Sequence, residues 1–123
     1  MLTINKIILI ILLITNNCFA QNKEWTGTEK ILLGTSTTAL MMDWATTRDI
    51  TRRYEEGYYE KNKLLGKHPS KTRVDIHFLI FIPLNYYIAD NLNENRSAYL
   101  LAITASELYA VRRNKQLGLQ ITF

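Results

Sequence analysis

YEKNKLLGKHPS, residues 59–70, is a polar stretch that lies between two long apolar segments. It contains a glycine, Gly66, and its proline, Pro69, disfavours helical geometry at the preceding His68. Basic residues are concentrated around it, since eight of the 15 Lys and Arg occur between Arg48 and Arg73. We interpret this stretch as part of a basic loop that separates helical segments on either side.

The segment before the loop begins with a helix N-terminal signature. TGTE at residues 26–29 fits a capping box, in which the Thr26 hydroxyl accepts the N3 amide and Glu29 bonds back. A long apolar run follows, and the positive charges of Arg52 and Arg53 suit a helix C-terminus. These features predict a first helix that ends near Arg52 and Arg53.

Two further helices are predicted after the loop. Thr72 and Asp75 repeat the capping-box spacing, and residues 76–89 are apolar on all sides, with an expected kink at Pro83. A polar turn at residues 91–97 leads to an apolar helix at residues 98–111, closed by basic residues. Residues 117–123 alternate like an edge strand or an interfacial tail. The fold class is therefore all-α: a small bundle of about three helices with a short extended C-terminal tail.

Residues 1–20 have the composition of a secretory signal peptide. Lys6 precedes the aliphatic residues 7–14, and small residues at Cys18 and Ala20 offer a cleavage site before Gln21. Eight aliphatic residues are too few to span a bilayer, which needs roughly 20. We expect cleavage after Ala20, with an uncleaved anchor or a lipid-modified Cys18 as alternatives. Residues 21–123 then form one domain, and the single cysteine excludes a disulfide within the mature chain.

Charge distribution bears on whether the helices span a membrane. If three helices span with the N-terminus outside, the inner segments carry eleven Lys and Arg and the outer segments three. This imbalance obeys the positive-inside rule. The mean hydropathy is nevertheless slightly negative. A small integral membrane bundle is our first interpretation, and a periplasmic helical protein bound peripherally through its basic, tyrosine-containing loop is the alternative.

Two carboxylates lie within apolar helices. Asp43 has three alternative placements. It lies on the solvent-exposed side of its helix, it faces the interior of a membrane bundle, or it forms local hydrogen bonds with neighbouring threonines such as Thr47. Glu107 shares a helix face with apolar residues. If the first and third helices run parallel, the two carboxylates lie at similar depth and form a polar cluster with Asn85 or His77. His77 is otherwise interpreted as a core or interfacial histidine.

The polar residues also carry a family resemblance. DWATTRDI at residues 43–50 and EKNKLLGKHPS at residues 60–70 resemble a family of small, uncharacterised membrane proteins of bacteria, phages and prophages. Its pattern is Asp-x-x-Gln/Thr-Thr-Arg followed by Glu-x-Asn-Pro-x-Leu-Gly-x-His-Pro-Ser, and the resemblance extends from Asp43 to Phe123. The chain departs from it at Lys63, where the pattern has proline. The resemblance implies a membrane protein and no particular activity.

The sequence has no phosphate-binding glycine loop, cysteine pair or nucleophile elbow. We expect a non-enzymatic, exported envelope protein, with a phage gene as one candidate origin. It would contact membrane lipids and act on host envelope integrity, as a lysis accessory or envelope modifier. The alternatives are a membrane-embedded hydrolase-like enzyme that uses Asp43, Glu60 and Glu107, and a periplasmic binding protein. The polar candidates for a structural or functional role are Asp43, Thr47, Glu60, Asn62, Gly66, His68, His77, Asn85 and Glu107.

No metal or cofactor is expected, and export argues against a nucleic-acid partner. A second copy of the chain or other envelope proteins are the further partners that we consider. The expected location is the inner membrane, with the periplasm or the outer membrane as alternatives.

Overall fold

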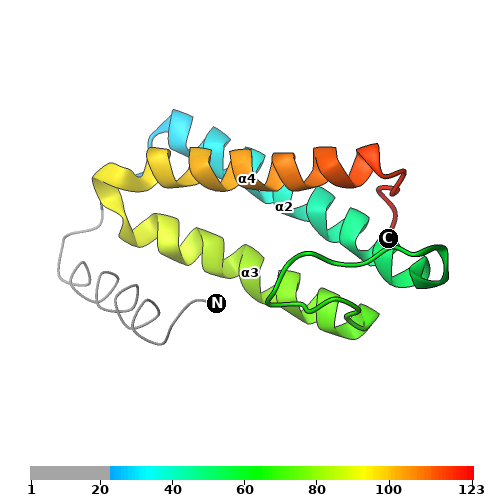
Figure 1. Ribbon diagram of the computed structural model, residues 1–123. Coiled ribbons are helices and arrows are strands. Elements are labelled where there is room, and N and C mark those ends of the chain that lie inside the picture. Colours follow the sequence, from blue (N-terminus) through cyan, green and yellow to red (C-terminus); the bar gives the residue numbers. More distant parts are fainter. Residues whose placement is uncertain (1–22) are drawn as a thin grey trace.

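The computed structural model describes residues 23–123 (Figure 1), so the predicted signal peptide with Cys18 lies outside the described residues. Three long helices make up the described part: α2 (Gly27–Arg52), α3 (Lys71–Asn91) and α4 (Arg96–Gln116). One-turn 3-10 helices, η1 (Tyr54–Glu56) and η2 (Asn93–Asn95), follow α2 and α3. No strand occurs in residues 23–123, and the prediction of an all-α bundle of about three helices is confirmed.

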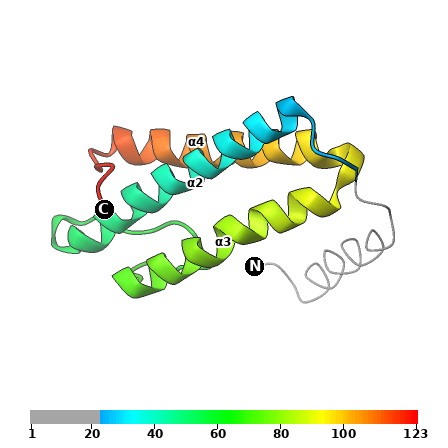
Figure 2. The ribbon, with the colours of Figure 1, turned by 180° about the vertical axis from the view of Figure 1, so that it is seen from behind.

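The three helices form a bundle in which α2 and α4 run parallel and α3 runs antiparallel to both. Figures 1 and 2 show this order from opposite sides, with the loop of residues 53–70 at one end and η2 at the other. The apolar core contains Leu40 of α2, Leu65 of the loop, and Val74 and Phe78 of α3. Because Leu65 is 2% exposed, the basic loop is anchored in the core rather than projecting from the bundle.

The capping box at the start of α2 is present as predicted. The Thr26 side chain accepts the Glu29 amide at 3.2 Å, and Glu29 accepts the Thr26 amide at 2.8 Å. At the other end, Arg52 lies in the last turn and Arg53 is the C-cap residue. Local chemistry therefore explains both ends of α2.

The predicted start of α3 is wrong by two residues. Ser70, not Thr72, is the N-cap residue, because the Ser70 hydroxyl accepts the Arg73 amide at 3.2 Å. Thr72 already lies inside the first turn. The helix then continues through the exposed Pro83 to Asn91. Among residues 23–123, no helix combines the length and the apolar character needed to cross a membrane.

Replacing Ser70 with alanine is expected to lower the free energy of unfolding by about 1 kcal/mol, because the Arg73 amide loses its partner. Thr72→Ala, the matched control, removes a hydroxyl without removing the cap and should change stability by less than about 0.5 kcal/mol. Urea unfolding followed by circular dichroism measures both. An equal effect of the two substitutions would contradict this assignment of the cap.

The C-terminal tail is not an edge strand. Leu119 is buried, the Gln120 amide donates to Asp49 Oδ2 at 2.9 Å, and Arg52 donates to the Thr122 hydroxyl at 2.7 Å. Phe123 packs edge-on against Trp44. These side-chain contacts to the last turns of α2 replace the ladder of backbone bonds that a strand would need, and they hold the tail in an extended conformation across the end of the bundle.

Candidate functional site

Three carboxylates from separate parts of the chain meet around one hollow. Asp43 comes from α2, Glu107 from α4 and Glu60 from the loop. We call this the carboxylate hollow; its volume is about 250 Å³, and its remaining lining residues are Lys61, Asn62, Ser106, Ala110, Arg113 and Asn114. Because α2 and α4 run parallel, Asp43 and Glu107 lie at the same level of the bundle.

Burial and mutual repulsion keep a proton on this group of carboxylates. Burial, followed by the nearby charges of Glu107 and Glu60, raises the pKa of Asp43 to about 8, while Arg113 acts in the opposite direction. Burial also raises the pKa of Glu107, and its hydrogen bond with Asp43 partly opposes this. Near neutral pH, Asp43 therefore carries a proton, which it donates to Glu107.

Asn114 completes the α2–α4 contact beside the hollow. It is 5% exposed, and its amide donates to the Thr46 hydroxyl at 2.9 Å and to Asp43 Oδ1 at 3.4 Å. The Thr46 hydroxyl in turn donates to the Asp43 carbonyl at 3.1 Å. Sequence reasoning missed Asn114, since it follows two arginines in a segment interpreted as the basic end of the last helix. Its helical spacing of seven from Glu107 is the signal that was available.

The loop holds Glu60 in place through a compact turn. The Glu60 amide donates to the Lys67 carbonyl at 2.9 Å, and Glu60 Oε1 accepts the Asn62 amide at 2.6 Å. Asn62 accepts the Leu64 amide through its side chain and the amides of Leu65 and Gly66 through its carbonyl. This turn forms although Lys63 stands where the family pattern has proline.

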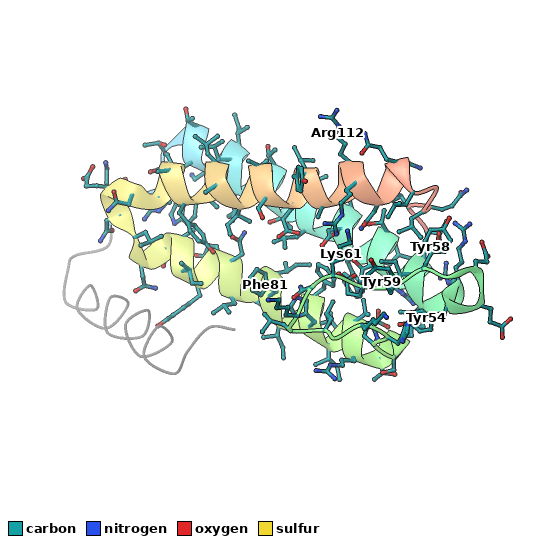
Figure 3. The ribbon with its side chains drawn as sticks, in the orientation of Figure 1. Tyr54, Tyr58, Tyr59, Lys61, Phe81 and Arg112 are labelled. Atoms are coloured by element: carbon teal, nitrogen blue, oxygen red, sulfur yellow. The ribbon has the colours of Figure 1, made fainter. Side chains whose placement is uncertain are left out.

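A positive φ of 84° at Gly66 allows the chain to leave this turn, because glycine adopts that conformation without a Cβ clash. Figure 3 shows Tyr54, Tyr58, Tyr59 and Lys61 around the loop, at the end of the bundle where α2 stops and α3 starts. The loop therefore carries an aromatic and basic surface next to the carboxylate hollow.

The two histidines lie outside the carboxylate hollow. His68 is exposed and packs edge-on against Tyr54, with 4.9 Å between ring centroids. His77 is half-buried and stacks on Phe81, and burial lowers its pKa while the Glu60 charge partly opposes that effect. His77 is thus packed against aromatic side chains, as expected of a core or interfacial histidine.

The expectation that Asn85 or His77 would join the Asp43–Glu107 cluster is wrong. Asn85 is buried and donates to the Ser36 hydroxyl at 3.1 Å. Ser36 precedes Asp43 by seven residues on α2, which is about 10 Å along the helix, so Asn85 bonds at a different level. Thr47 is buried within the bundle, on the same turn as Thr46. Among residues 23–123, no group of three or more His, Cys, Asp and Glu is arranged to hold a metal ion.

A second polar cluster lies at the opposite end of the bundle, around a fully buried arginine. Arg96 Nη1 contacts Glu29 Oε2 at 3.2 Å, and its other nitrogens donate to the carbonyls of Ala89, Lys23 and Asp90 at 3.0–3.3 Å. The guanidinium lies 4.2 Å from the centroid of Trp25. This buried arginine cluster connects all three helices, and the sequence patterns did not predict it.

No protein-family model, curated protein or solved structure matches this chain.

Proposed function

We propose that this chain is a small, non-enzymatic protein of the bacterial cell envelope that binds a membrane surface through the outer face of α3 and acts on envelope integrity. The proposal includes export by the N-terminal segment, and a location at the inner membrane. The observation that carries it is the apolar outer face of α3.

The outer face of α3 is a continuous stripe of exposed apolar side chains. Its members follow helical spacing and are between 39% and 59% exposed: Ile76, Leu79, Ile80, Leu84 and Tyr87. Exposed apolar residues usually occur singly on a soluble surface, and contiguous ones mark an interaction site. The stripe is about 17 Å long at 1.5 Å per residue. That is about half of a hydrocarbon core of roughly 30 Å, so the stripe fits a helix that lies in the membrane interface.

Positive charge at one end of the stripe complements anionic lipid headgroups. Lys71 and Arg73 begin α3 and are exposed, and Lys63 and Lys67 of the loop are exposed close by in sequence. Arg73 also donates to the carbonyl of Leu64, whose side chain is 68% exposed. Each basic residue near an anionic surface contributes about 1 kcal/mol.

Two carboxylates lie near the start of the stripe, and the one on α3 itself is already paired. Asp75 is half-buried, with 3.3 Å to Arg48 Nε and a hydrogen bond from the Trp44 indole at 2.8 Å. Glu60 of the loop is the other one, and it stands against the four basic residues named above. The electrostatic pattern of this end of α3 therefore favours an anionic lipid surface as the partner.

Ile80→Glu is expected to weaken binding to vesicles of phosphatidylglycerol and phosphatidylethanolamine by roughly 100-fold, because it removes apolar area and places a charge at the centre of the stripe. Ile31→Glu is the matched control, since Ile31 is 70% exposed on α2, away from this face. Co-sedimentation with vesicles measures both, and purely zwitterionic vesicles should bind the parent chain more weakly. Equal binding of the two variants would contradict the proposal.

The action on envelope integrity is tested in cells by leakage of a cytoplasmic marker after expression. The parent chain and the variants Asp43→Ala and Glu60→Ala should cause leakage, whereas Ile80→Glu should not. The opposite result would contradict the proposal: if Asp43→Ala and Glu60→Ala cause no leakage and Ile80→Glu still does, the carboxylate hollow is the functional site.

One observation favours a second candidate, a hydrolase-like enzyme. The carboxylate hollow combines a carboxyl with a pKa of about 8 at Asp43 with neighbouring carboxylates at Glu60 and Glu107, which is the combination used for general acid and base catalysis. This candidate predicts that Asp43→Asn and Glu107→Gln abolish the cellular effect although both variants remain folded.

A further inference from the structure

A second exposed face lies on α4, opposite the side that packs into the bundle. The packed side contains the buried residues Leu100, Val111 and Asn114. On the other side, exposed residues recur at alternating intervals of three and four, the spacing of a coiled-coil seam: Ala98, Leu101, Ala105, Leu108 and Arg112. Leu101 is 55% exposed and Leu108 44% exposed. Alanine and leucine alternate strictly along this seam.

The alternation is self-complementary when a second α4 lies antiparallel. Placing a two-fold axis beside residue 103 sets Leu101 opposite the second copy's Ala105 and Ala98 opposite its Leu108. Each large side chain then meets a small one, which permits close approach of the two helices. A parallel arrangement in register would instead place leucine against leucine.

The charged residues near the two ends of the seam fit the same antiparallel arrangement. Glu94 lies in η2, four residues before Ala98, and Arg112 ends the seam, so the two are symmetrical in sequence about residue 103. Arg112 is exposed, and the Glu94 side chain is 80% exposed and contacts only the exposed Lys23, at 3.1 Å. An antiparallel pair therefore brings the η2 end of each copy, which carries Glu94, beside the Arg112 end of the other, whereas a parallel pair would bring Arg112 to Arg112.

We propose that this face of α4 binds a second copy of the chain, antiparallel and with two-fold symmetry about residue 103. The complementary charges and the leucine–alanine alternation select a second copy as the occupant, because a lipid surface would require neither. The interface is isologous, so each of its contacts occurs twice. It leaves the outer face of α3 free.

Charge reversal of the full chain tests this assignment. Arg112→Glu and Glu94→Arg, each alone, should raise the dimer dissociation constant roughly tenfold, because like charges then face each other in two symmetrical places. The double variant Glu94→Arg/Arg112→Glu should restore dimerisation. Sedimentation velocity measures association, and circular dichroism verifies that each variant keeps its helices. A monomeric parent chain, or a double variant as weak as the single ones, would overturn the proposal.

Cysteine cross-linking tests the register independently. With Cys18 replaced by serine, a mixture of Leu101→Cys and Ala105→Cys chains should cross-link to mixed dimers more efficiently than either variant alone. Preferred cross-linking of Leu101→Cys with itself would show a different packing and refute the register. The proposal would also be refuted if the chain stayed monomeric and vesicles shielded the α4 cysteines from reaction. That result would identify this face of α4 as a lipid-binding surface.

Discussion

Replacing the buried Arg96 with methionine is expected to lower the free energy of unfolding by about 3–5 kcal/mol. The guanidinium is fully enclosed and makes an ion pair with Glu29 and three bonds to backbone carbonyls. Methionine fills a similar volume, but it leaves the Glu29 carboxylate without its cationic partner, with only the Thr26 amide and hydroxyl still donating to it. It also removes one donor from each of the three carbonyls. Loss of one partner from a buried polar cluster is among the most destabilising single changes in proteins.

The position of Arg96 explains why its loss should affect the entire bundle. Its contacts reach the start of α2 through Glu29 and the end of α3 through Ala89 and Asp90. Trp25 stacks on the guanidinium and donates to Asp90 Oδ1 at 2.7 Å, so the segment before α2 is attached to the same cluster. We therefore expect a single cooperative loss of stability rather than local fraying.

Urea unfolding followed by circular dichroism measures the effect. Lys30→Met, which removes an exposed basic residue at the same end of the bundle, is the matched control and should change stability by no more than about 0.5 kcal/mol. The double variant Arg96→Met/Glu29→Gln should recover part of the loss, because glutamine removes the unpaired charge and still accepts the Thr26 amide of the capping box. A loss below about 1 kcal/mol for Arg96→Met would contradict a structural role for the cluster.

The helices were predictable because their signals are local. The capping box at Thr26, the basic end of α2 and the apolar runs of α3 and α4 each depend on residues within one helix. The error at the start of α3 shows the limit of such signals. Ser70 and Thr72 both present a hydroxyl within the same few residues, and only the backbone geometry of the folded chain shows that Ser70 is the cap.

The positions of the polar residues could be predicted only where their spacing along a helix was enough to place them. Asp43 and Glu107 could be placed at one level because parallel helices preserve the spacing of their residues. Glu60 could not, since its position depends on the turn around Asn62 and on the burial of Leu65. Arg96 was missed for a related reason: its partners lie up to 73 residues away in sequence, and no local pattern distinguishes it from a surface arginine.

The contribution of Asp43 to the stability of the parent chain is expected to fall as pH rises from about 4 to about 8. The pKa of Asp43 is raised to about 8 in the folded state, against about 3.8 when unfolded. Between these values the folded chain binds a proton that the unfolded chain has released, so increasing pH favours unfolding. Asp43→Asn removes this proton uptake and keeps a hydrogen-bond donor for Glu107. At pH 8 the variant should therefore be more stable than the parent chain by on the order of 3 kcal/mol.

The comparison between variant and parent isolates Asp43 from the other groups that titrate. The lowered pKa values of Glu29 and His77 make the fold less stable toward acid, and both groups are present in the two proteins. Around Asp43, the facing charged groups are Glu107 and Arg113 of α4 and Glu60 of the loop. Urea unfolding at pH 5, 6.5 and 8 should show a stability difference that grows with pH for Asp43→Asn. Glu55→Gln, an exposed control, should show a constant difference. If the difference for Asp43→Asn does not grow with pH, Asp43 is already ionised in the folded chain and shares no proton with Glu107.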